Sequence, residues 1–133
     1  MFTIKRYTSK DYDMIKSWWE AQKMMPPTQD MLPLDSTYIL CLEDTPALCV
    51  SIYFTNVKEY CYLECFIGNP EANNKPQRRE ATQILFDFVC DKIRERGHKK
   101  VVWISPTPTL TRYYKTWGLE PTITNVDTFC KVL

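Results

Sequence analysis

One stretch of the chain decides its fold: Ala81-Thr-Gln-Ile-Leu-Phe-Asp-Phe-Val-Cys-Asp-Lys-Ile93. Apolar residues recur in it at i, i+3, i+4, i+7, i+8 and i+12, the spacing that places side chains on one face of an α-helix. Gly97 is a suitable C-cap, and the basic residues Arg94 and Arg96 match the negative end of the helix dipole. The pattern predicts an amphipathic helix over residues 78–97 with one buried face.

Apolar strands flank this helix on both sides. Residues 60–67 precede it, and residues 100–105, with the core Val101-Val-Trp-Ile104, follow it. A helical crossover returns the chain to the level at which the previous strand began, so the two strands run parallel in one sheet. The sequence therefore predicts a βαβ unit.

The segments before residue 60 predict an antiparallel meander. Strands over residues 37–42, 47–56 and 60–67 are separated by the short turns Glu43-Asp-Thr-Pro46 and Val57-Lys-Glu59. An earlier strand covers residues 2–6. Thr8 then precedes Asp11 by three positions, a capping-box pattern, and apolar residues at helical spacing continue the helix to Gln22.

The segments after residue 105 complete the expected architecture. Pro106 and Pro108 begin a short helix that runs to about Thr116, and Gly118 terminates it. Two strands follow over residues 120–124 and 126–133. We therefore expect one α/β domain over residues 1–133. Its mixed sheet has six or seven strands, with helices on both faces.

The connection over residues 24–34 contains three prolines, which remove backbone donors and interrupt regular structure. We expect an irregular segment that exposes some of its methionine side chains. Two interpretations are open: a loop on the substrate side of a site, or a loop packed against the core.

Charge and hydropathy exclude several classes of protein. Seventeen Lys and Arg oppose sixteen Asp and Glu, so net charge gives no support for nucleic-acid binding. The N-terminus has no apolar signal region, and no apolar stretch approaches the ~20 residues that span a bilayer. We expect a soluble cytoplasmic protein without a membrane partner.

The six cysteines lie mostly within apolar runs, where a thiol behaves as a small hydrophobic group, and we expect them to be reduced. Cys61 and Cys65 fall on one face of a strand at period two. With His98 as the one histidine, the spacing favours no zinc site. It also leaves Cys49 and Cys65 without a base to activate them as nucleophiles.

The entrance of the long helix, residues 77–82, is a candidate phosphate site. The first N–H groups of a helix are unpaired and the helix dipole favours anions there. Arg78 and Arg79 are able to pair with phosphates, or are solvated first-turn arginines. The entrance lacks glycine, however, and carries the acid Glu80.

The order of elements resembles that of the GNAT superfamily of acyl-coenzyme A dependent N-acyltransferases. Two segments carry the likeness: Tyr113-Tyr-Lys-Thr-Trp-Gly118-Leu, and Gln77-x-x-Glu80-x-Thr82 followed by Ile84-Leu85. The second segment occupies the place of the family's pyrophosphate loop, whose middle glycine is here Glu80 and whose final small residue is Thr82. The family's usual asparagine, seven positions before the tyrosine, is Thr107.

This resemblance implies acetyl transfer from the cosubstrate acetyl-coenzyme A to an amine on a small molecule or protein, by direct attack. Tyr114 matches the family's general acid, and the backbone N–H groups of Phe66 and Ile67 correspond to those that hold the thioester carbonyl. The resemblance places coenzyme contacts at Gln77, Arg78, Arg79, Ala81, Thr82 and Thr107.

Glu64 is a candidate base for the amine proton, provided that it faces the cleft, because it lies on the same strand as Ile67. A rival interpretation gives the chain the same fold without catalysis. Because Glu80 replaces the expected glycine, the chain would then act as a binding or structural protein, with the apolar residues of the 24–34 loop as a partner surface.

Overall fold

The computed structural model describes residues 1–72, 75–103, 118–119 and 131. Within these residues the α-helices are α1 (Tyr12–Ala21) and α2 (Lys75–Glu95). The strands are β1 (Phe2–Arg6), β2 (Thr37–Leu42), β3 (Thr45–Tyr53), β4 (Tyr60–Gly68) and β5 (Lys100–Trp103). Short 3₁₀ turns cover Ser9–Asp11, Gln29–Met31 and Pro70–Ala72.

The described strands form one mixed sheet in the order β1-β2-β3-β4-β5. Neighbouring strands are antiparallel from β1 to β4, whereas β4 and β5 are parallel. This confirms the predicted meander and the predicted βαβ unit. The sheet described has five strands and not six or seven, because both predicted C-terminal strands, like the predicted helix after Pro106, fall outside the described residues.

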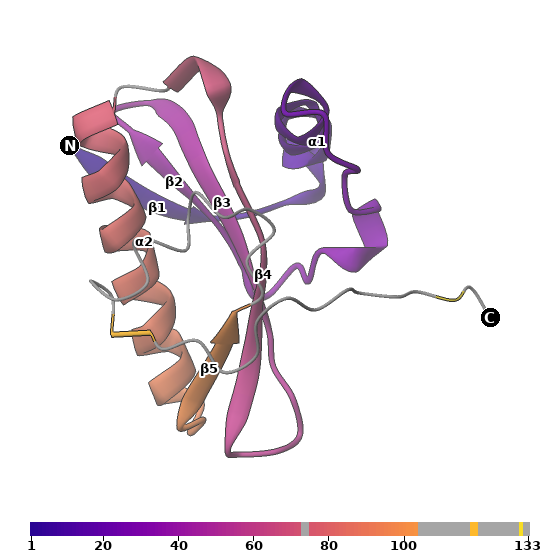
Figure 1. Cartoon of the computed structure of the whole chain (residues 1–133), viewed down its shortest axis with the longest axis vertical. Coiled ribbons are helices and arrows are strands. Elements are labelled where there is room, and N and C mark those ends of the chain that lie inside the picture. The colour runs from indigo at the N-terminus through magenta and orange to yellow at the C-terminus, as the bar shows by residue number, and fades with distance from the viewer. Residues whose placement is uncertain (73–74, 104–117, 120–130, 132–133) are drawn as a thin grey trace.

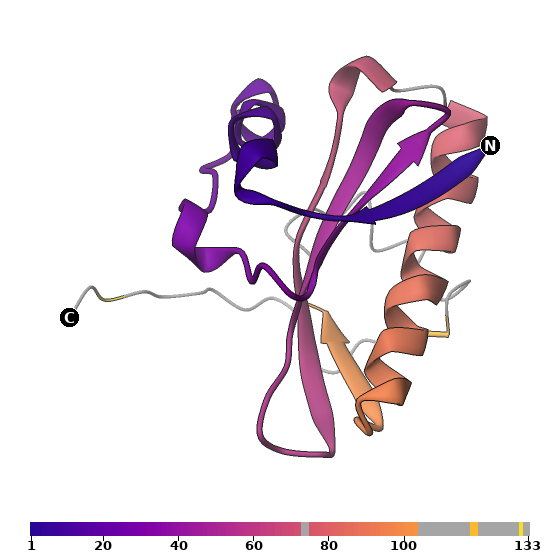
Figure 2. The same cartoon turned by 180° about the vertical axis from the view of Figure 1, so that it is seen from behind.

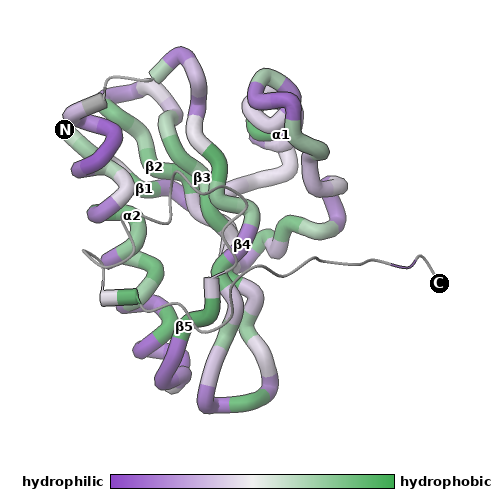
Figure 3. The backbone as a smooth tube through the Cα atoms, viewed as in Figure 1, coloured by the Kyte–Doolittle hydropathy of each residue, from purple (hydrophilic) through white to green (hydrophobic). Residues whose placement is uncertain are grey.

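The two helices cover opposite faces of the sheet, as expected from the sequence (Figures 1 and 2). On the α2 face, fully buried side chains include those of Leu40, Leu48, Leu63, Leu85 and Val89. The α1 face has its own cluster, with Tyr7, Ile15, Trp18, Ile39 and Cys49. Figure 3 shows apolar residues along the central strands and alternating apolar and polar residues along α2, the pattern of a helix with one buried face.

Several element boundaries differ from the predicted ones by one to three residues, among them the start of α2 and the end of β3. Helix α2 begins at Lys75 and not at Arg78, because proline is tolerated in the first turn of a helix and Pro76 therefore does not delay its start. Strand β3 ends at Tyr53 and not at Asn56. There the Thr55 hydroxyl donates to the backbone oxygen of Tyr60 over 2.6 Å and begins the turn to β4.

A β-bulge interrupts the pairing of β3 with β4. Ser51 lies opposite Glu64, but Cys49 lies opposite Ile67, so one residue of β3, Val50, faces two residues of β4. One of these two, Cys65, has a φ of 55°, in the left-handed region that non-glycine residues seldom occupy. The bulge therefore adds one residue to β4 close to its C-terminal end.

The bulge reverses which side chains of β4 face each helix. Cys61 packs in the cluster on the α2 face, while Cys65 packs against the cluster on the α1 face together with Ile67. The prediction that Cys61 and Cys65 share a face was wrong, because period-two alternation holds only while the pairing register is constant. Each of the five described cysteines is a free thiol, and Cys130 lies outside the described residues.

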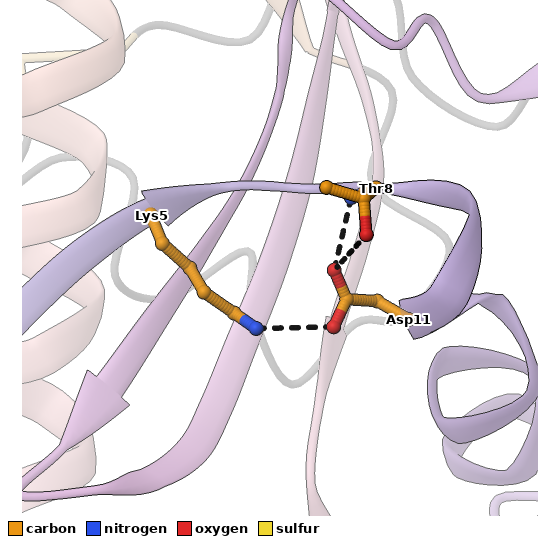
Figure 4. Close-up of polar contacts among 3 residues, drawn as sticks. All are labelled: Lys5, Thr8 and Asp11. Atoms are coloured by element: carbon orange, nitrogen blue, oxygen red, sulfur yellow. Dashed lines mark hydrogen bonds and ion pairs between the residues drawn. The ribbon is translucent and has the colours of Figure 1, made fainter.

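The start of α1 is fixed by Asp11, as Figure 4 shows. Its carboxylate accepts the backbone N–H of Thr8 over 2.9 Å and lies 3.0 Å from the ammonium nitrogen of Lys5. Partial burial acts to raise the pKa of Asp11, but the Thr8 N–H and the Lys5 charge outweigh it and lower that pKa below its ordinary value. The predicted pairing of Thr8 with Asp11 is confirmed by this contact.

Asp11→Asn should destabilise the protein by about 0.5–1 kcal/mol at pH 7, through loss of the charged contacts at the helix start. Because the folded-state pKa of Asp11 is lowered, its carboxylate stabilises the fold above the unfolded pKa of about 3.9 and loses that effect as pH falls through the folded pKa. Urea unfolding at pH 7 and at about pH 3 checks both statements. Asp13→Asn is the control, since Asp13 lies in the adjoining first turn of α1 and its carboxylate contacts neither Thr8 nor Lys5; an equal loss in both variants would contradict the assignment.

Candidate functional site

The C-terminal end of β4 is held in place by contacts with the end of α1 and with β3. Gln22, at the end of α1, donates from Nε2 to the backbone oxygen of Gly68 over 2.9 Å. Asn69 then fixes the exit of the chain, because its backbone N–H donates to the oxygen of Ala47 and its side-chain amide donates to the oxygen of Pro46, each over 2.8 Å. The bulged strand therefore ends at a defined position.

Arg78 of α2 reaches back to this strand end. Its guanidinium lies against Gly68 so closely that a Cβ atom on Gly68 would overlap it. The side chain is half-buried, and burial lowers the pKa of the guanidinium. Arg78 is thus no freely solvated arginine, whereas the neighbouring Arg79 is exposed. The absence of a side chain at Gly68 is what permits this approach.

The predicted phosphate loop forms the first turns of a helix. Only the first four residues of an α-helix have N–H groups without an intrahelical partner; in α2 these are residues 75–78, and Pro76 has no N–H. Backbone N–H groups outside the helical hydrogen-bond ladder are thus confined to the first turn of α2. From Arg79 onward the N–H groups belong to the helix, because the chain has no glycine there to interrupt it.

Side chains in these turns separate into buried and exposed sets. Ala81 is fully buried and Thr82 is 8% exposed, and the Thr82 hydroxyl donates to the backbone oxygen of Arg78 over 2.8 Å. Gln77 and Glu80 are exposed. Ala81 and Thr82 thus attach the helix start to the core, and the Glu80 carboxylate lies at the surface of the second turn.

Phe66 and Ile67 lie directly after the bulged residue and are buried on opposite faces. The Phe66 ring packs on the α2 side, with its centroid 5.4 Å from that of Trp103, and Ile67 packs on the α1 side. Within the described residues, β4 and β5 pair from Tyr60–Lys100 to Leu63–Trp103, so this pairing does not include Phe66 or Ile67. Their role in holding a carbonyl group stays a prediction.

Glu64 and Cys65 face the side of the sheet that carries α1. Glu64 is half-buried opposite Ser51. The Cys65 sulfur lies 3.2 Å from the Tyr53 hydroxyl, and burial raises the pKa of this thiol. Burial also raises the pKa of the Cys49 thiol, so both thiols stay protonated.

The single histidine lies beside the start of β4, since the chain enters β5 just after it and Lys100 pairs with Tyr60. From there to Cys65 is about 16 Å along the strand. His98 is buried against Phe54, with ring centroids 5.6 Å apart. It is therefore unable to activate Cys65.

The 24–34 loop packs against the core and also exposes apolar side chains. Leu32 is buried in the α1-side cluster, while Met25, Met31 and Leu34 are 90%, 52% and 60% exposed. The loop is tied down at one end by the Tyr12 hydroxyl, which donates to the backbone oxygen of Pro27 over 2.8 Å. The predicted exposure of methionine side chains is confirmed, and the loop packs against the core through Leu32; its place on the substrate side of a site stays a prediction.

The sequence interpretation missed Tyr53 and Gln22, which contact the loop and the strand end. Tyr53 is the third of the alternating residues Cys49, Ser51 and Tyr53, so the period of β3 could have placed it on the face of Glu64. No comparable signal marks Gln22, whose contact joins residues 46 positions apart. Thr107 and Tyr114 lie outside the described residues.

Neither described helix combines the length and the apolar content needed to cross a bilayer. Among the described residues, no group of three or more metal-ligating side chains gathers at one place.

The contacts above define the candidate site. It consists of the bulged end of β4, the start of α2, and the α1 face of the sheet beneath the 24–34 loop.

No family model matches the sequence, and no curated protein is detectably similar to it. Solved structures do match. A predicted acetyltransferase from Clostridium acetobutylicum, solved with acetyl-CoA, is similar with a TM-score of 0.70 at 14% identity, over 97% of this chain and 96% of that one. The chain has the GNAT acetyltransferase fold.

Two further structures with this fold match over nearly their full lengths. A GCN5-related N-acetyltransferase from Ralstonia eutropha has a TM-score of 0.69 at 15% identity, over 98% of this chain and 99% of that one. Glucosamine-6-phosphate N-acetyltransferase from Arabidopsis thaliana has a TM-score of 0.67 at 13% identity, with the same coverage. The fold expected from the sequence resemblance is therefore confirmed, in a divergent form.

Gly68→Ala should cost about 1–3 kcal/mol of stability, because the added methyl group displaces the Arg78 guanidinium. In an Arg78→Ala background the cost should fall below about 1 kcal/mol, since the obstacle is gone. Denaturant unfolding of the four proteins in this cycle measures the coupling. Arg79→Ala is the matched control, and a Gly68→Ala cost reduced as much by that change would contradict the assigned contact.

Proposed function

We propose that this GNAT-fold chain transfers an acetyl group from acetyl-coenzyme A to an amine by direct attack. The observation that carries the proposal is the bulged end of β4, fixed by Gln22 and Asn69 beside the start of α2. Likeness in fold to acetyltransferases over nearly the whole chain supports it.

The coenzyme would lie across the strand end and the helix start. The backbone of the first turn of α2, at Gln77 and Arg78, and the guanidinium of Arg79 would receive the pyrophosphate, because the positive end of a helix dipole and a bidentate cation both favour phosphate oxygens. Ala81 and Thr82 would hold the helix close enough to β4 for this contact. Thr107 would complete the coenzyme site, on the strength of the sequence resemblance.

The chemistry requires three groups around the thioester. A neutral amine attacks the carbonyl carbon, and the oxyanion that forms accepts hydrogen bonds from backbone N–H groups at Phe66 and Ile67. Glu64 accepts the amine proton, directly or through water. The intermediate then collapses, the C–S bond breaks, and Tyr114 protonates the leaving thiolate of coenzyme A.

Because Glu64 would be the base, the amine acceptor would approach from the α1 face of the sheet, on which Glu64 lies. Glu64 faces α1 together with Cys65 and Tyr53, and the 24–34 loop contacts Tyr53 on that face. An amine entering beneath the loop would meet the carboxylate before it reached the strand end. The acceptor is accordingly a small molecule, or a protein segment that fits beneath this loop.

A second candidate function is that of a binding protein without catalysis. It is favoured by one observation: α2 continues without interruption through the segment that corresponds to the family's glycine-containing loop. This leaves fewer free N–H groups for a pyrophosphate than an open loop would. The exposed apolar residues of the 24–34 loop would then contact a protein partner.

Titration calorimetry with acetyl-coenzyme A should show one site with a dissociation constant between about 1 μM and 1 mM, the usual range for enzyme substrates. Release of coenzyme A should rise when amines such as spermidine, glucosamine 6-phosphate or a peptide with a free N-terminus are added. Mass spectrometry of the coenzyme avoids interference from the protein's own thiols. No binding at millimolar coenzyme would refute acetyl transfer, and binding without turnover on any amine would favour the second candidate.

Glu80→Gln should tighten coenzyme A binding by about twofold to fivefold at low ionic strength, because it removes a negative charge near the helix end that receives the pyrophosphate. That range corresponds to about 0.4–1 kcal/mol, within the roughly 0.2–1 kcal/mol typical of an interaction between two exposed charges. Glutamine preserves helix propensity, whereas glycine would weaken α2. Glu95→Gln, at the opposite end of α2, is the control; unchanged affinity in Glu80→Gln would place its carboxylate away from the coenzyme.

A further inference from the structure

The Tyr53 hydroxyl joins two parts of the site that are distant in sequence. It donates to the backbone oxygen of Met31 in the 24–34 loop over 2.8 Å, and it lies 3.2 Å from the Cys65 sulfur in the bulge of β4. Tyr53 itself lies at the end of β3, between these two contacts. One side chain therefore connects the loop, the central strand and the bulge.

The direction of these hydrogen bonds follows from the number of protons available. A tyrosine hydroxyl has one proton, and the carbonyl of Met31 can only accept, so that proton points to Met31. The contact with Cys65 must then use the thiol proton, with the Tyr53 oxygen as acceptor. The result is a hydrogen-bond chain from S–H to O–H to C=O, in which the Tyr53 hydroxyl accepts from Cys65 and donates to Met31.

The Tyr53 hydroxyl and the Cys65 thiol, the two titratable groups of this hydrogen-bond chain, stay protonated at physiological pH. Burial raises the pKa of Tyr53, with the neighbouring Cys65 adding to the rise, and burial also raises the pKa of Cys65. A neutral chain of this kind fixes positions without placing a charge beside the reacting groups. It is suited to holding an arrangement and unsuited to moving a proton.

We propose that Tyr53 is a positioning residue that couples the 24–34 loop to the bulged end of β4. The inference rests on the proposed function: the loop would cover the amine, and the bulge would hold the thioester. One hydroxyl then sets the position of the loop relative to the strand end. Binding of acetyl-coenzyme A at the strand end would then change the mobility of the loop through Tyr53.

The backbone at Cys65 gives the coupling a physical basis. Its φ of 55° is unfavourable for a residue with a side chain, so the bulge persists only while surrounding contacts hold it. The hydrogen bond to Tyr53 is one such contact, and it depends on the position of a hydroxyl that also binds the loop. Two segments that share a partner in this way change position together.

Hydrogen exchange measured by mass spectrometry tests the coupling without ligand. Tyr53→Phe should raise exchange about fivefold in peptides that cover the 24–34 loop and also in peptides that cover residues 64–67, the factor for loss of a typical hydrogen bond. Tyr12→Phe is the matched control, because its hydroxyl holds the same loop through Pro27 without contacting the bulge. It should raise exchange in the loop alone.

Cys65→Ala separates the effects of the two hydrogen bonds of Tyr53, because it removes the thiol donor and leaves the bond from Tyr53 to Met31. Exchange should then rise at residues 64–67 and stay unchanged in the loop. The proposal is overturned if Tyr53→Phe leaves exchange at residues 64–67 unchanged, or if Tyr12→Phe raises it equally. A uniform rise over all strands would indicate a general loss of stability and would also count against the proposal.

Acetyl-coenzyme A supplies the functional arm of the test. It should slow exchange in the 24–34 loop in the unmodified protein and in Tyr12→Phe, but not in Tyr53→Phe. Protection that persists in Tyr53→Phe would refute transmission through this hydroxyl. If calorimetry shows that acetyl-coenzyme A does not bind the unmodified protein, the proposed function fails, and the exchange pattern without ligand alone decides the role of Tyr53.

Discussion

The single extra residue in β4 is the constraint on which the site depends. Up to Glu64 the strand pairs with β3 in one register, and from Ile67 onward it pairs in another. This shift turns Phe66 toward α2 and leaves Glu64, Cys65 and Ile67 on the face of α1. A regular strand would have placed Cys65 in the other core layer, away from Tyr53 and the 24–34 loop. A bulge near a strand end is a common means of directing side chains toward a site.

The start of α2 shows how a change in local sequence alters the means available for binding an anion. Glycine would interrupt the helix and expose several backbone donors, but this chain has Glu80 at the corresponding position and a helix that begins at Lys75. The donors that lie outside the helical ladder are those of the first turn, and the Arg78 guanidinium lies against Gly68. If this chain binds a coenzyme, charged side chains must therefore contribute more of the affinity than backbone groups do. Whether charged side chains supply that affinity distinguishes an acyltransferase with a modified coenzyme site from a protein that has kept the fold alone.

The fold and the chemistry are linked by side chains that bridge distant segments. Gln22 joins the end of α1 to the end of β4, and Tyr53 joins the 24–34 loop to the bulge. Each bridge uses a side chain that is polar only at its tip, with an apolar or neutral stem that packs against the sheet. Solved acetyltransferases share the fold at about 13–15% identity, so the fold does not by itself determine function, which depends on local contacts.

The sequence by itself determined the elements whose signal is local. The apolar stripe of α2, the alternating strands of the meander, the βαβ unit and the pairing of Thr8 with Asp11 all follow from spacing along the chain, and the structure confirms them. Only the tertiary structure decided the face of Cys65, the contact of Arg78 with Gly68 and the two partners of Tyr53. The physical reason is that a bulge is defined by the register between two strands, and a close approach by the packing of a helix on a sheet. Neither quantity is a property of any one segment, so no periodicity in the sequence encodes it.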